Sequence, residues 1–115
     1  MPYYDFLFLE LDFFSSANAD SYFLPASVFS SSIAEFLKTL SKVDFNCIAV
    51  LITSDKVYEN LEWNWGYREN DELGGSDPYS ASKAAAELIF DSYKSAFFHG
   101  NEFQGLASVR AGNVI

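Results

Sequence analysis

Apolar residues of this chain gather into segments whose spacing alternates between the pattern of a strand and the pattern of a helix. The first segment, 4–11 (YDFLFLEL), is a short run of aromatic and branched residues, which predicts a strand. Polar residues typical of turns follow at 15–21, and beyond Pro25 the apolar residues recur at helical spacing. This spacing predicts a helix over 26–42.

The run 47–53 (CIAVLIT) is the candidate central strand. It is apolar without interruption and rich in branched residues, a composition typical of a parallel strand that is covered on both faces. We therefore expect it in the middle of a sheet with both faces covered. Cys47 opens this run and is the single cysteine of the chain, so we expect a buried, unreactive thiol and no internal disulfide.

Segment 54–77 has a different character. Tryptophan, asparagine, glycine and acidic residues follow one another there without a regular period, which predicts a long structured loop. Loops of more than about a dozen residues in a compact domain are usually functional. Trp63, Trp65 and Tyr67 could line a substrate site in this loop, but aromatic residues at such positions more often pack beneath the loop, and we favour packing.

A second helix follows the loop. Asp77 and Pro78 have the character of an N-cap and a first helical residue, and an alanine-rich stretch continues the helix towards Phe98. Gly100 and Asn101 interrupt it. The residues at 106–109 then predict a short last strand, which ends in the sequence RAGN.

Strand, helix, strand, helix and strand in this order predict the α/β class. We expect a partial Rossmann-like, doubly wound, parallel sheet of about three strands with flanking helices and right-handed crossovers. In open sheets of this kind, ligands bind at the carboxyl ends of the strands. Those ends are the residues just after Thr53 and just after Arg110, and both places are polar.

Composition restricts the partners. With 115 residues, half of them apolar, the chain predicts one compact domain with a real core. A formal charge of −9 argues against nucleic acid and anionic membranes as partners, because phosphate-rich surfaces would be repelled. The apolar first residues lack a preceding positive region and are interrupted by Asp5, Glu10 and Asp12, so we expect neither a signal peptide nor a membrane anchor, and a cytoplasmic protein.

Tyr79 and Lys83 form a Tyr-x-x-x-Lys pair at the start of the second helix. The spacing puts phenol and ammonium on one helix face, where the positive charge favours an ionised phenolate that can act as a general base. By itself the spacing also fits an ordinary exposed helix face. Likewise Thr53, Ser54, Asp55 and Lys56 at the end of the central strand are residue types common in surface turns.

The ordered series of these motifs is more specific than either pair. ITSDKVYENLEWNWGYREND, GGSDPYSASKAAAEL and SVRAGNVI follow one another, and in this order they resemble the extended short-chain dehydrogenase/reductase family, within it the nucleotide-sugar 4,6-dehydratases. Lys56 stands where most of these enzymes carry glutamate, which makes the branch that acts on CDP-glucose the closest.

The resemblance implies an NAD-dependent lyase reaction by internal redox, which converts CDP-glucose to CDP-4-keto-6-deoxyglucose. It makes Tyr79 with Lys83 the base for the sugar 4-hydroxyl, Ser54 a hydrogen-bond partner of the 4-oxygen and Asp55 the acid for the leaving 6-hydroxyl. Lys56 takes the position of the C5 base.

The remaining implied contacts concern the ligands. Thr53, Tyr79, Lys83 and Ala111 would contact NAD, and Ser54 and Asn113 would contact the nucleotide sugar. No metal site is implied. Self-association, or association with parts of the enzyme that this segment lacks, is the partner expectation.

The sequence departs from the family in its glycines, which lie at 66, 74, 75, 100, 105 and 112 without the phosphate-binding spacing. We therefore expect 1–115 to be a partial NAD(P)-binding domain without the N-terminal glycine-rich half and the C-terminal substrate domain. Such a segment would be inactive alone, because the catalysis depends on positioning. The alternative is a non-catalytic α/β module that pairs with a partner through its exposed sheet edge.

Overall fold

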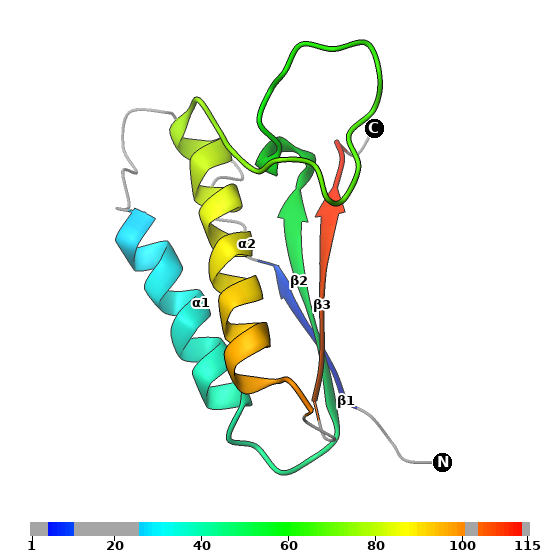
Figure 1. Ribbon diagram of the computed structural model, residues 1–115. Helices are drawn as coiled ribbons and strands as arrows, with labels where there is room; N and C mark the ends of the chain where they lie inside the picture. The colour runs from blue at the N-terminus through cyan, green and yellow to red at the C-terminus, as the bar shows by residue number, and fades with distance from the viewer. Residues whose placement is uncertain (1–4, 11–25, 101–103, 114–115) are drawn as a thin grey trace.

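A computed structural model describes residues 5–10, 26–100 and 104–113 (Figure 1). The elements are β1 (Asp5–Glu10), α1 (Ala26–Leu40), β2 (Cys47–Ser54), a short 3-10 helix η1 (Asp55–Val57), α2 (Pro78–Phe97) and β3 (Gln104–Ala111). The predicted order of elements is confirmed, and β3 is longer than the strand predicted at 106–109. The expected turn at 15–21 lies outside the described residues.

The strands form a parallel sheet in the order β1-β2-β3, with β2 in the middle. The predicted α/β class and the partial Rossmann-like arrangement are therefore confirmed. Along β2 and β3 the register runs from Cys47 opposite Gln104 to Ser54 opposite Ala111. Both strands thus reach the same end of the sheet together.

The two helices lie on one side of the sheet and pack against each other (Figure 1). Burial along β2 alternates residue by residue, and the side that faces the helices is buried. The expectation that both faces of β2 are covered is wrong, because Ile48, Val50 and Ile52 on the opposite side stay partly exposed among the described residues. The core consists of Ile33, Leu37, Leu40, Cys47, Ala49, Leu51, Ala86, Phe90 and Phe98.

Local sequence explains where α2 begins and where it ends. The Asp77 side chain accepts a hydrogen bond from the Ser80 amide at 3.0 Å, and Pro78 follows it, so the predicted N-cap of α2 is confirmed. Gly100 adopts a φ of 75°, a conformation that side chains rarely allow, just beyond the end of α2.

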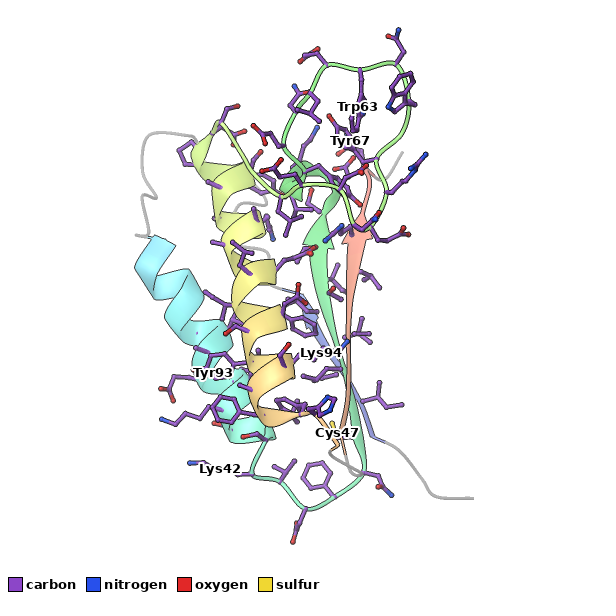
Figure 2. All side chains as sticks on the ribbon, viewed as in Figure 1. Lys42, Cys47, Trp63, Tyr67, Tyr93 and Lys94 are labelled. Carbon is purple, nitrogen blue, oxygen red and sulfur yellow. The ribbon has the colours of Figure 1, made fainter. Side chains whose placement is uncertain are left out.

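Cys47 is buried and forms no disulfide, as expected, and it lies at the end of the sheet opposite the loop that carries Trp63 and Tyr67 (Figure 2). Neither helix of the described residues is long and apolar enough to cross a membrane.

Candidate active site at the carboxyl end of the sheet

The polar residues that follow β2 and β3 meet at one end of the sheet. Thr53 lies opposite Arg110 and Ser54 opposite Ala111 in the parallel register. Immediately after Ser54 the chain turns into η1, where the Ser54 hydroxyl oxygen accepts a hydrogen bond of 3.2 Å from the Lys56 amide. This cap begins the 3-10 helix, and the side chains of Asp55 and Lys56 are exposed beyond the strand end.

Asp55 points towards the end of β3. A Cβ added to Gly112 would lie 4.0 Å from Asp55 Oδ2, and the Ser54 hydroxyl donates to Asp55 Oδ1 at 3.2 Å. Ser54, Asp55 and the residues after Ala111 therefore form one polar rim. Ala111 and Asn113 are both exposed on this rim.

Tyr79 and Lys83 enter the site from α2. Lys83 is 5% exposed, and its Nζ lies 5.7 Å from the centre of the Tyr79 ring. The predicted helix face therefore exists, but it is not the open surface of an exposed helix, since it packs towards η1 and the sheet. Tyr79 itself is half-buried.

A cleft of about 580 Å³ opens between η1, the long loop and the first turn of α2. It is lined by Asp55, Lys56, Tyr58, Asn60, Tyr67, Gly75, Ser76, Asp77 and Ser80. Two aromatic rings among carboxylates, hydroxyls, an amide and an ammonium suit a small ligand rich in hydroxyl groups. Of the predicted catalytic residues, Asp55 and Lys56 line this cleft.

The loop returns to the sheet by pairing with its own beginning. Tyr58 forms an antiparallel bridge with Leu73, and the Gly74 amide donates to the Val57 carbonyl at 2.8 Å. Gly75 then packs on the start of α2, where an added Cβ would come within 2.5 Å of the Ala81 nitrogen. Only glycine fits this approach, and it sets the position of the Asp77 cap beside the cleft.

Asp77 has a lowered pKa because its carboxylate accepts hydrogen bonds from the backbone and the side chain of Ser80. The two bonds measure 3.0 Å from the amide and 2.7 Å from the hydroxyl. A negative charge consequently occupies the amino end of α2, the place where a helix could otherwise bind a phosphate.

A buried ion pair that the sequence analysis missed lies beneath this rim. Glu87 of α2 is 2% exposed, and its carboxylate accepts bonds of 2.9 and 3.0 Å from Arg110 Nε. Nη2 of Arg110 also binds it, and the Thr53 hydroxyl donates to Glu87 Oε1. Hydrogen bonding to Glu87 raises the pKa of Arg110. One sequence signal could have found Glu87, because a glutamate on the same face as Lys83 and Phe90 requires a buried partner.

Nη1 of Arg110 extends the contacts to the loop. It donates to the Tyr58 hydroxyl at 2.9 Å and to the Glu69 carbonyl at 2.8 Å. Arg110 therefore joins β3 and α2 to the start of the long loop at Tyr58 and to its later part at Glu69.

Comparison with known proteins agrees with the motif series. No family model matches this chain. In an alignment of 102 positions, which covers 83% of the chain, it is 46% identical to CDP-glucose 4,6-dehydratase of Salmonella typhimurium. The chain is a relative of part of that dehydratase. The resemblance predicted from the sequence is thereby confirmed. The aligned segment spans 28% of the length of the Salmonella dehydratase, so the chain corresponds to less than a third of it.

The dehydratase resemblance assigned roles to residues that the structure now locates. Ser54, Asp55, Lys56, Ala111 and Asn113 lie on the rim at the strand ends, and Tyr79 and Lys83 lie on the adjoining face of α2. Thr53 is different, since its side chain is on the buried, helix-facing side of β2 and donates to Glu87. These catalytic and ligand-binding roles stay predictions.

The aromatic residues of the loop divide between two environments. Trp65 is 69% exposed, whereas Trp63 and Tyr67 are half-buried and their ring centres lie 5.3 Å apart. Packing beneath the loop therefore describes Trp63, while Tyr67 packs and also lines the cleft. Within the described residues, no group of histidine, cysteine or acidic side chains is arranged to hold a metal ion.

Proposed function

We propose that this chain carries the catalytic centre of a nucleotide-sugar 4,6-dehydratase that acts on a CDP-glucose-like substrate with NAD. The observation that carries the proposal is the meeting of the Ser54–Lys56 turn with the end of β3, beside the Tyr79 and Lys83 face of α2. Identity of 46% to a CDP-glucose 4,6-dehydratase across this segment supports the choice of reaction.

In the proposed reaction Tyr79, with Lys83 beside it, takes the proton of the sugar 4-hydroxyl, and Ser54 donates a hydrogen bond to the 4-oxygen. The cofactor, when bound, supplies reversible hydride transfer. Lys56, in its neutral form, removes the C5 proton, and Asp55 in its acid form protonates the departing 6-hydroxyl, so one water is lost across C5 and C6. The hydride from C4 ends on C6 and a proton ends on C5, which leaves a 4-keto-6-deoxy sugar with no net oxidation.

The described residues fit one end of NAD and not the other. Tyr79 and Lys83 on α2 and Ala111 at the end of β3 are the residues that would contact the nicotinamide riboside. The amino end of α2 is capped by the Asp77 carboxylate, and Gly75 is used in packing against α2, so neither offers a site for the pyrophosphate. We propose that the chain alone does not bind NAD or turn over substrate.

A non-catalytic interaction module is the second candidate. Val109 on β3 is 45% exposed, and Ile48, Val50 and Ile52 of β2 are partly exposed on the side away from the helices. Such an apolar face favours association with another polypeptide, as do the edges of β1 and β3, which pair only with β2 among the described residues. This module would bind a partner without any need for Tyr79.

Thermal unfolding of the chain with and without NAD and CDP-glucose tests the proposal that the chain alone binds neither ligand. A ligand that binds the folded form raises the unfolding midpoint, and we expect no shift with either compound. A rise with NAD would contradict the proposed lack of an anchor for the pyrophosphate.

A chimera separates the two candidates. The chain replaces the matching segment of the Salmonella dehydratase, and formation of the 4-keto product from CDP-glucose is measured. We expect activity, and at least roughly a hundredfold loss with Tyr79→Phe, which removes the general base. Tyr93→Phe is the matched control on the same helix, because Tyr93 packs against the core. A folded chimera that binds NAD without making product would refute the catalytic proposal.

A further inference from the structure

A ladder of rings runs from the buried ion pair to the surface of the loop. The Arg110 guanidinium carbon lies 4.8 Å from the centre of the Tyr58 ring, and Tyr58 stacks on Tyr67 at 4.8 Å with an interplanar angle of 11°. Tyr67 packs against Trp63 at 5.3 Å, and Trp63 packs against Trp65 at 5.9 Å. Figure 2 shows Trp63 and Tyr67 together on the loop above the strand ends.

The inner members of this ladder form a wall of the cleft. Tyr58 and Tyr67 both line it, and the Tyr67 hydroxyl oxygen accepts a hydrogen bond of 3.0 Å from the Leu61 amide. The position of the wall therefore depends on where the Tyr58 ring is held. Tyr58 follows η1 directly, so the same anchor bears on the position of Asp55 and Lys56.

Arg110 is placed to hold that ring in two ways. Its charge contacts the ring face, and its Nη1 donates to the Tyr58 hydroxyl. Through the Glu69 carbonyl, the same nitrogen also anchors the far side of the loop. Glu87 fixes the guanidinium from the opposite side with its carboxylate, so the planar fork cannot rotate away.

We propose that Arg110 is a positioning residue that keeps the 58–77 loop folded over the cleft and orders the stacked Tyr58 and Tyr67 rings that form a wall of the cleft. The effect is geometric and does not depend on which ligand occupies the cleft. It therefore stands or falls separately from the proposed dehydratase function.

Tryptophan fluorescence tests this proposal directly, because the two tryptophans of the chain, Trp63 and Trp65, both lie on the loop. Acrylamide quenching of their emission in the full chain reports how open the loop is. Arg110→Lys keeps a positive charge for Glu87 but loses the planar fork, and we expect the quenching slope to rise roughly twofold. Arg68→Lys makes the same substitution at an exposed position of the loop and should leave the slope unchanged.

Circular dichroism distinguishes an open loop from a weakened fold. For Arg110→Lys, the quenching slope should rise at temperatures where the helical signal is still that of the folded chain. A slope equal to that of the unsubstituted chain at those temperatures would overturn the proposal.

A double variant keeps the test valid if Arg110→Lys does not fold. Glu87→Gln with Arg110→Met removes both buried charges at once, which avoids an unpaired carboxylate. The slope should rise in this variant as well, and a folded double variant with an unchanged slope would overturn the role of Arg110.

Discussion

The helix-covered side of the sheet and its carboxyl end are stabilised by different kinds of contact. On the covered side, apolar residues of α1, α2 and β2 pack together, and their spacing repeats within each element. At the carboxyl end, single polar contacts join residues far apart in the chain, such as Thr53 with Glu87 across 34 residues and Arg110 with Tyr58 across 52. Periodicity in a sequence reports the first kind of contact and is silent about the second.

Leu37→Ala tests the covered side and should have the largest effect. Leu37 is 2% exposed in the centre of the core, and its truncation should lower the free energy of unfolding by about 3–4 kcal/mol, through lost burial and the cavity left behind. Urea unfolding followed by circular dichroism measures the change. Lys38→Ala, at the exposed neighbouring position, should change stability by less than about 0.5 kcal/mol. Equal effects of the two substitutions would contradict the assigned core.

Glu87→Ala tests how much the polar contacts at the carboxyl end of the sheet contribute to stability. It leaves the Arg110 cation without its carboxylate, and we expect a loss of about 3 kcal/mol, at the low end for a buried pair because the Arg110 side chain keeps 16% exposure. Urea unfolding measures it, with Glu35→Ala on the exposed face of α1 as the control. If Glu87→Ala cost no more than this control, the polar end would not contribute to the fold.

Gly75→Ala tests the seam between the loop and α2. The added methyl group would meet the Ser80–Ala81 backbone at 2.5–2.6 Å, so the loop must shift, and we expect a loss of about 1–3 kcal/mol. Gly66→Ala, where an added Cβ has nothing within 4 Å, is the matched control. Equal unfolding midpoints for the two variants would show that the loop does not pack on α2 in this way.

Asp77→Ala should have the smallest effect, about 1 kcal/mol at neutral pH, because it removes one N-cap. The folded-state pKa of Asp77 lies below its ordinary value of 3.8, so its stabilising effect is fully present above that value and is lost as the pH falls through the lower one. The difference in unfolding free energy between the parent and Asp77→Ala should therefore shrink below about pH 4. A difference that grows in acid would contradict the capping role.

These differences explain how much the sequence predicted. The elements, their parallel order and the N-cap at Asp77 follow from local patterns of apolar residues and turn chemistry, and they are confirmed. The predicted helix at 26–42 ends at Leu40, where the chain makes turn bonds instead, such as the Lys42 amide to the Thr39 carbonyl at 3.1 Å.

The prediction for β2 failed for a physical reason. Its residues are apolar on both sides, which shows that both faces of the strand could be buried. The run does not show whether other elements cover both faces. In the described part of the chain, the helices cover one side.

The Glu87–Arg110 pair was missed because the spacing of Glu87 with Lys83 and Phe90 can indicate a buried glutamate but does not identify its partner. Its partner lies 23 residues later, on another element, and no local pattern links the two. The arrangement of the cleft around Tyr58 and Tyr67 depends on this pair. Because the pair was not predicted, the arrangement of the cleft could not be predicted either.

Side chains along β2 alternate between the two faces of the sheet, so the hydroxyls of two neighbouring residues make different contacts. Thr53 faces the helices, and its hydroxyl donates a hydrogen bond to Glu87 of the ion pair. Ser54 is the next residue, and its hydroxyl accepts a hydrogen bond from the Lys56 amide in the turn beyond the strand. Because side chains alternate between the faces of a strand, inserting or deleting one residue within β2 would exchange these two assignments. Insertions or deletions in this strand must therefore come in pairs of residues. A change of one residue would turn the Thr53 hydroxyl away from the helices and the Ser54 hydroxyl towards them.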